Sequence, residues 1–234
     1  SWLDGAYTNN GYPTFKSMSF PDFNGDGLAD VGEVSIGFYN AGTVGLSTGV
    51  AFSVALQSIF PGGSLVDKSL RYMDVDGDGR SDALLYDGSN SIKAYLFKGS
   101  YYNLPAQSWG TVSESPSADK VQYADVNGDG FVDVVVQTTD NRFLVGLSNG
   151  AGFQTQSQWV QHTGTFVKGQ VQYADVNGDR LADLLLQDSN NAIWVSLSTG
   201  VSFGEPQLWV QLAGSFVENQ VTYADVNSDG FADV

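Results

Sequence analysis

One acidic phrase of nine residues returns five times along the chain, and no other feature of the sequence limits its fold as strongly. In the third copy the phrase reads DVNGDGFVD, and successive copies start 52, 51, 50 and 50 residues apart. We call the copies loops 1 to 5, and they occupy residues 22–30, 74–82, 125–133, 175–183 and 225–233. A constant period over the whole chain is typical of repeat proteins, in which each unit packs on its neighbours. The sequence therefore predicts a single domain, residues 1–234, built from five repeats of which the first and last are incomplete.

Two further marks recur with the same period. A phrase ending in G-x-x-F lies between the loops: VGLSTGVAF at 44–52, VGLSNGAGF at 145–153, VSLSTGVSF at 195–203 and a degraded AYLFKGSYY at 94–102. Trp109, Trp159 and Trp209 each stand 16 residues before the next loop. The repeat thus extends beyond the acidic phrase and leaves no segment that reads as a linker.

Each period reads as four short strands. In the third repeat VQYADV and RFLVGLS alternate apolar and polar residues, VDVVVQ is a short apolar run, and FQTQSQWV supplies a fourth strand. Between them stand NGDG, TTDN and SNGAG, which are rich in residues that tolerate tight turns. Four strands in about 50 residues are typical of a propeller blade. The sequence therefore predicts an all-β propeller of four-stranded blades.

The spacing D-x-[DN]-x-D-G-x-x-D, followed by the G-x-x-F phrase, resembles the FG-GAP (or VCBS) repeat family, whose best-known member is the propeller of integrin α subunits. The resemblance implies that each loop joins the first two strands of a blade and holds one calcium ion on one face of the disc. It also implies seven blades, which at this period need about 350 residues. We therefore expect the chain to be a fragment, or a part that associates with another copy through its open propeller ends.

The loops have the chemistry of a calcium site. Calcium takes six to eight oxygen ligands, and a tight loop supplies them when every second residue points inward. Side-chain ligands are thus expected at positions 1, 3, 5 and 9: Asp22, Asn24, Asp26, Asp30, Asp74, Asp76, Asp78, Asp82, Asp125, Asn127, Asp129, Asp133, Asp175, Asn177, Asp179, Asp183, Asp225, Asn227, Asp229 and Asp233. Backbone carbonyl ligands are expected at position 7: Leu28, Arg80, Phe131, Leu181 and Phe231. The prediction is up to five Ca²⁺ ions, and the alternative is a set of hairpin turns without metal, which would need no acid at position 9.

The loops are not equivalent. Loop 2 has four carboxylates, so it is predicted to bind calcium most tightly. Loop 4 carries Arg180 at position 6, where the other loops have glycine. A non-glycine residue held at positive φ costs about 1 kcal/mol, and its charge opposes a cation. Loop 4 is therefore predicted to bind most weakly.

The charge of the chain follows from the loops. The net charge is −16, and 16 of the 26 acidic residues lie in the five loops, so five divalent ions would reduce the charge to −6. This balance argues against nucleic acid or anionic lipid as a partner. No apolar run reaches the length that inserts into a membrane, and cysteine is absent. We expect a secreted, extracellular protein whose signal peptide has been removed.

The aromatic residues and the single histidine are the other candidates for function. Trp109, Trp159 and Trp209 are interpreted either as wedges in the core between blades or as flat faces for sugar rings. Trp194 aligns with Leu144 of the previous repeat, which indicates a packing variation. His162 aligns with Leu212, which indicates a buried or indifferent position and not a general base.

Two classes of function remain open at this point. Calcium repeated in every blade suits a structural role, and like sites suit a multivalent binding module for a glycan or a cell-surface glycoprotein. The alternative is a carbohydrate-active enzyme, because some polysaccharide lyases resemble this repeat family. The loops themselves supply neither a nucleophile nor a base, so binding is favoured and no catalytic residue is assigned.

Overall fold

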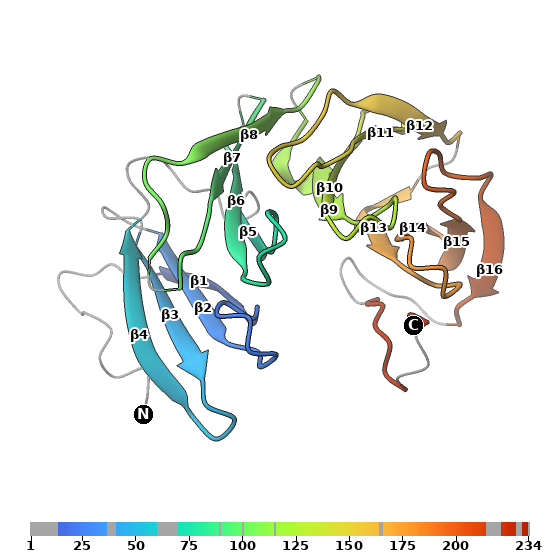
Figure 1. Cartoon of the computed structure of the whole chain (residues 1–234). Coiled ribbons are helices and arrows are strands. Elements are labelled where there is room, and N and C mark those ends of the chain that lie inside the picture. The colour runs from blue at the N-terminus through green and yellow to red at the C-terminus, as the bar shows by residue number, and fades with distance from the viewer. Residues whose placement is uncertain are drawn as a thin grey trace. The chain divides into compact units, whose positions relative to one another are not determined.

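The computed structural model of the chain describes residues 14–36, 41–59, 70–88, 90–99, 101–114, 116–163, 166–213, 221–227 and 231–233. The chain divides into two compact units, Ser1–Trp109 and Gly110–Val234. Within these units the described residues form four antiparallel sheets of four strands each, with the strands in chain order (Figure 1). The all-β fold with blade-like, four-stranded sheets is thereby confirmed, whereas a single domain stays a prediction.

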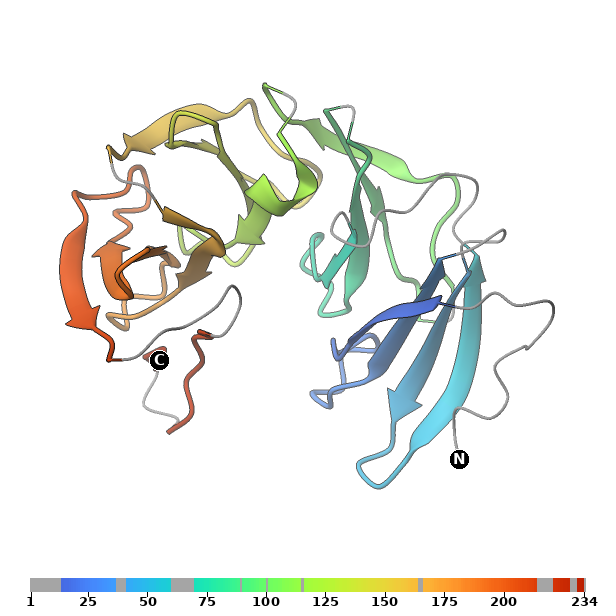
Figure 2. The ribbon, with the colours of Figure 1, turned by 180° about the vertical axis from the view of Figure 1, so that it is seen from behind.

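The first unit contains two sheets. The first sheet consists of β1 (Thr14–Ser19), β2 (Val31–Ile36), β3 (Ala41–Ser47) and β4 (Phe52–Ile59). The second consists of β5 (Leu70–Met73), β6 (Asp82–Tyr86), β7 (Ser91–Tyr95) and β8 (Gln107–Thr111), whose last residues lie past the unit boundary. Figure 2 shows the strands of the first sheet side by side from behind.

The second unit contains the other two sheets. One follows a short 3-10 helix, Ala118–Lys120, and consists of β9 (Val121–Ala124), β10 (Asp133–Gln137), β11 (Arg142–Gly146) and β12 (Ser157–Gln161). The other consists of β13 (Phe166–Ala174), β14 (Asp183–Asp188), β15 (Ala192–Ser196) and β16 (Gln207–Gln211). The fifth repeat is represented by a bridge between Ala224 and Asp233. The described part of the chain contains no helix with the length and apolar character needed to cross a bilayer.

Strand composition follows position in the sheet. The second strand is central, and in β10 the run Asp133–Val136 is buried throughout because both faces of the sheet are covered. The outermost strand β12 exposes Ser157 and Gln158 and buries Trp159. The alternation of apolar and polar residues in the sequence therefore reports how much of each strand is covered.

Apolar side chains from neighbouring sheets meet in shared clusters. In the first unit Phe23 packs on Tyr72 and Phe97, with ring centroids 5.1 and 5.8 Å apart. Phe23 occupies position 2 of loop 1, and the equivalent residues of loops 2 to 4 are also buried: Val75, Val126 and Val176. Each of loops 1 to 4 is thus anchored in the core by its residue at position 2.

Candidate metal loops

The first aspartate of loops 1 to 4 fixes the loop backbone. Asp125 accepts hydrogen bonds from the amide of Gly128 to Oδ1 (2.7 Å) and from the amide of Gly130 to Oδ2 (2.9 Å). The first aspartates of loops 1, 2 and 4 accept the equivalent pairs of amides: Asp22 from Gly25 and Gly27, Asp74 from Gly77 and Gly79, and Asp175 from Gly178 and Arg180. The carboxylate at position 1 is therefore held inside the turn, in the place predicted for a ligand. As predicted, loops 1 to 4 join the first two strands of their sheets.

Two positions of the loop require left-handed backbone. In loop 3 Gly128 has φ 74° and Gly130 has φ 88°. Arg180, at position 6 of loop 4, has φ 70°, which confirms the backbone strain predicted for this residue. The positive φ at position 4 was not predicted from the sequence, although loops 1 to 4 all have glycine there.

Positions 3 and 5 meet through their side chains. In loop 3 the Nδ2 of Asn127 donates to Oδ2 of Asp129 at 2.8 Å, while Oδ1 of Asp129 accepts the amide of Phe131 at 2.9 Å. The amide of Asp129 in turn donates to Oδ1 of Asn127 at 3.1 Å. In loop 2 the corresponding residues are acidic, and oxygen atoms of Asp74, Asp76 and Asp78 all lie within 4.8 Å of one another.

The aspartate at position 9 is buried. Asp133 is 0% exposed, and its oxygens accept the amides of Ser148 (2.7 Å) and Val126 (3.1 Å). Asp30, Asp82 and Asp183 make the same two bonds in their repeats. This carboxylate ties the loop to the residues that follow the third strand, a structural task that the sequence prediction of a ligand did not include.

Burial changes the acidity of these position-9 carboxyls. Loss of solvation raises the pKa of Asp82 to about 7, although the amides of Phe97 and Val75 oppose the change. The same cause raises the pKa of Asp133 and of Asp183 to about 6. A bound cation would favour the ionised form of each.

Neighbouring loops are joined directly by backbone hydrogen bonds. The amide of Ala182 in loop 4 donates to the carbonyl oxygen of Asp125 in loop 3 at 2.9 Å. Ser81 donates to Asp22 at 3.0 Å, and Ala232 donates to Asp175 at 2.8 Å. In each case position 8 of one loop reaches position 1 of the preceding loop, so the loops lie at the seams between sheets.

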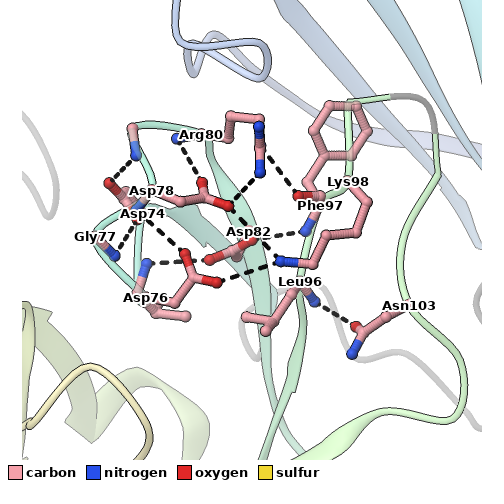
Figure 3. Close-up of polar contacts among 12 residues, drawn as sticks. Asp74, Asp76, Gly77, Asp78, Arg80, Asp82, Leu96, Phe97, Lys98 and Asn103 are labelled. Atoms are coloured by element: carbon pink, nitrogen blue, oxygen red, sulfur yellow. Dashed lines mark hydrogen bonds and ion pairs between the residues drawn. The ribbon is translucent and has the colours of Figure 1, made fainter.

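Loop 2 differs because two basic side chains lie on it (Figure 3). Arg80 Nη2 lies 2.5 Å from Asp78 Oδ2, and Arg80 Nε donates to the carbonyl of Phe97 at 3.3 Å. Lys98 Nζ lies 3.4 Å from Asp76 Oδ2 and 3.7 Å from Asp78 Oδ2. Among loops 1 to 4, the ion pairs recorded in the described ranges reach the carboxylates of loop 2 alone.

The donor set fits calcium. The loops present carboxylate and amide oxygens, the hard ligands that calcium prefers, on a backbone whose turns are fixed. The cluster in loop 2 could hold a metal ion. The carbonyl ligands at position 7 and the number of ions stay predictions. In loop 5 Asp233 accepts the amide of Val226 at 3.1 Å, while Asp229 lies outside the described residues.

The three repeated tryptophans differ in exposure. Trp109 is 2% and Trp159 8% exposed, and neither ring presents an open face that a sugar could stack on. Trp209 is 47% exposed. Trp109 and Trp159 are therefore buried, and Trp159 packs on Phe203 of the next repeat. Of the three tryptophans predicted as sugar-binding faces, Trp209 has a partly open ring.

His162 and Trp194 serve packing. His162 is 5% exposed, and its Nε2 lies 3.2 Å from Ser196 Oγ. Burial lowers the pKa of His162, so its neutral form is favoured. Trp194 is partly buried and donates from Nε1 to Asp188 Oδ2 at 3.1 Å. The buried interpretation of His162 is confirmed.

Known structures share this fold. A lectin of Agrocybe aegerita, described as recognising non-reducing terminal N-acetylglucosamine, matches with a TM-score of 0.75 at 20% identity over 96% of this chain. The chain spans 61% of that lectin's length. The Photorhabdus luminescens Tc holotoxin pore matches with a TM-score of 0.51 at 16% identity, over 94% of this chain and 14% of that one. No curated protein sequence matches the chain.

The family model supplies the assignment. The FG-GAP-like repeat model matches three overlapping segments, 74–136, 125–186 and 175–234, each of which starts at the first aspartate of a loop. The matches cover more than half of the chain, and they coincide with the loops, strands and seams described above. The chain belongs to the FG-GAP-like repeat family.

Proposed function

We propose that the protein is a calcium-stabilised recognition module that binds glycans outside the cell. The observation that carries the calcium part is the contact between neighbouring loops, in which position 8 of one loop donates to position 1 of the loop before it. An ion that holds one loop in its native shape also preserves that loop's bond to the adjacent sheet. Calcium in these loops would therefore act on stability and not on turnover.

The electrostatics of the loops support the same role. Without a cation, loops 1 and 3 each gather three carboxylates in nine residues. An ion that binds only the native state stabilises it by RT ln(1 + [L]/Kd), about 2.7 kcal/mol per site at a hundredfold excess over Kd. Several such sites would dominate the stability of a domain of this size.

The glycan part is supported by the likeness to a lectin over 96% of the chain. At 20% identity this likeness concerns the fold. Exposed aromatic rings suit the flat, apolar faces of sugars. In the described part of the chain these rings are Phe20 (62% exposed), Tyr101 (62%), Trp209 (47%), Phe231 (42%) and Phe52 (38%). An extracellular location agrees with loops of this type, because calcium modules outside the cell work at 10⁻⁴ to 10⁻³ M calcium.

The calcium proposal is tested by thermal unfolding. The protein is dialysed against chelator and melted in excess chelator, in calcium and in magnesium. We expect a rise of many degrees in Tm with calcium and a smaller rise with magnesium, which prefers a strict octahedral site. A Tm that is indifferent to calcium would contradict the proposal.

The glycan proposal is tested by a glycan array, with terminal N-acetylglucosamine included, in calcium and in chelator. Calcium-dependent binding to a defined set of sugars is the expected result. Incubation with acidic polysaccharides is run in parallel, because their breakdown would support the polysaccharide lyase alternative instead. Absence of both binding and breakdown would contradict the glycan assignment while leaving the calcium proposal intact.

Self-association through open propeller ends stays a prediction, and sedimentation over a range of concentrations tests it. A concentration-dependent dimer would support it, and a monomer at all concentrations would contradict it.

A further inference from the structure

We infer that loop 2 supplies its own counter-ions and that Lys98 controls how tightly this loop binds calcium. The inference rests on the proposed calcium binding and goes beyond it in one respect. It makes loop 2 less calcium-dependent than loop 3, although loop 2 has the most carboxylates. This reverses the order of calcium affinity that the number of carboxylates predicts for the two loops.

The other loops show what loop 2 lacks. In loops 1, 3 and 4 the asparagine at position 3 donates from Nδ2 to Oδ2 of the aspartate at position 5. The three bonds are Asn24 to Asp26 (2.9 Å), Asn127 to Asp129 (2.8 Å) and Asn177 to Asp179 (2.9 Å). A neutral amide thus satisfies the acid at position 5 from within the loop.

In loop 2 a lysine from elsewhere in the repeat takes over this task. Asp76 at position 3 has no proton to donate, and Lys98 Nζ lies 3.4 Å from Asp76 Oδ2 and 3.7 Å from Asp78 Oδ2, between the two carboxylates (Figure 3). Lys98 follows β7 and aligns with Asn149 and Thr199, which are neutral. Repeat 2 therefore has the charged residues Asp76 and Lys98 at two positions where repeat 3 has the neutral residues Asn127 and Asn149.

Arg80 adds a second cation to the same carboxylates. Its guanidinium reaches Asp78 Oδ2 and is oriented by the carbonyl of Phe97. The side chains of Asp76, Asp78, Arg80 and Lys98 are each 18–35% exposed, so water screens these pairs less than it screens pairs on an open surface. Loop 2 therefore has its charge compensated by the chain itself.

This arrangement sets a cost on calcium binding. The Oδ2 atoms that face Lys98 are among the oxygens that a calcium ion would use, so the ion must displace the ammonium group. The displaced ammonium stays nearby and repels the ion. In loop 3, by contrast, the oxygens of Asp125 and Asp129 face no basic side chain in the described residues.

The test follows calcium binding loop by loop in ¹⁵N spectra of the whole chain. The amides of Gly77 and Gly79 donate hydrogen bonds to Asp74 and report on loop 2. The amides of Gly128 and Gly130 donate to Asp125 and report on loop 3. We expect loop 3 to saturate at lower calcium than loop 2. Lys98→Asn should lower the loop 2 midpoint by roughly fivefold, the value of a partly exposed ion pair, and leave loop 3 unchanged.

Lys93→Asn is the matched control. Lys93 lies in the same repeat and pairs with Asp87 at 3.7 Å, away from the loop, so its removal changes the net charge equally. Both midpoints should stay where they are. Equal shifts from Lys98→Asn and Lys93→Asn would reduce the effect to net charge and overturn the inference.

Melting in chelator distinguishes a change in calcium affinity from misfolding of the variant. In chelator Lys98→Asn should lower Tm, because Asp76 and Asp78 lose their counter-ion, and the double variant Asp76→Asn, Lys98→Asn should recover it by restoring the pattern of loop 3. If loop 2 saturates first and Lys98→Asn changes nothing, the inference fails and the calcium proposal stands. If no glycine amide responds to calcium, both fail.

Discussion

The indole ring of Trp159 meets the phenyl ring of Phe203 edge-on, with ring centroids 5.2 Å apart and an angle of 61° between the planes. Trp159 lies on β12, and Phe203 ends the G-x-x-F phrase of the following repeat. Tyr173 also contacts Phe203, with centroids 6.2 Å apart. The two recurrent aromatic marks of the sequence are thus the two halves of one contact between sheets.

Replacing Trp159 by alanine should destabilise the protein by about 3–5 kcal/mol, because it removes a buried ring and leaves a cavity. Trp209→Ala is the matched control, because Trp209 is 47% exposed and its replacement removes less buried apolar surface. Chemical unfolding in calcium should show a cost for Trp209→Ala less than half that for Trp159→Ala. Equal costs would contradict the assignment of Trp159 as a core wedge.

Two glycines of loop 1 should respond differently to alanine. Gly25 and Gly27 both have positive φ, so each variant pays the same kind of backbone strain of about 1 kcal/mol. A Cβ on Gly25 would lie 2.7 Å from the carbonyl oxygen of Gly79 in loop 2, whereas a Cβ on Gly27 meets nothing within 4 Å. Unfolding measurements should find Gly25→Ala less stable than Gly27→Ala by at least about 1 kcal/mol. The reverse order would show that the seam between these loops is loose.

Arg180→Gly should stabilise the protein and tighten calcium binding at loop 4. The change removes a side chain from φ 70° and takes a positive charge from the loop. Melting in chelator gives the backbone relief, about 1 kcal/mol, minus the charge compensation that Arg180 gives to the metal-free carboxylates. A calcium titration followed at the Gly178 amide gives the effect on binding. Gly130→Arg in loop 3 should produce the opposite changes. Unchanged stability in both variants would mean that position 6 does not limit these loops.

The calcium-free protein should lose stability as pH rises from about 4 to 7. Asp82 has a pKa of about 7 in the folded protein, and Asp133 and Asp183 have a pKa of about 6, all above the usual 3.9 of the unfolded chain. The folded state therefore binds these protons more tightly, and its advantage, complete below the unfolded pKa, is lost as pH passes the folded values. Saturating calcium should flatten the profile, since the ion favours the ionised carboxyls.

A control is needed because the net charge of −16 acts in the same direction. Asp183→Asn removes one buried titration, and Glu205→Gln removes one exposed carboxyl. The slope of Tm against pH in chelator should fall in Asp183→Asn and stay close to the original in Glu205→Gln. The same slope in all three proteins would assign the pH dependence to overall repulsion.

Much of the fold could be predicted from the sequence because the repeat states each local feature several times. The strand order, the joining of first and second strands by the loops, and the strained Arg180 all follow from patterns within one period. Burial of Trp159 was left open, since a tryptophan suits both a core and a sugar site, and only its contact with Phe203 decides between them.

Contacts between separate phrases of one repeat were beyond the reach of the pattern. Asp133 accepts hydrogen bonds from the amides of Ser148 and Val126, and these depend on how the strands align in three dimensions. The sequence therefore predicted Asp133 as a ligand but not its structural role. The bridge from Lys98 to Asp76 spans 22 positions of the chain and joins two phrases that had been considered separately.

The hydrogen bond from position 8 of loops 2, 4 and 5 to position 1 of the preceding loop has a consequence for how such chains change length. The same donor and the same acceptor meet at the three described junctions: Ser81 with Asp22, Ala182 with Asp125 and Ala232 with Asp175. A segment of about 50 residues, duplicated or deleted in frame, presents an unaltered amide to its predecessor and an unaltered carbonyl to its successor. Whole-unit duplication would therefore be accommodated without a new interface, whereas a single residue inserted between positions 1 and 8 would put two junctions out of step.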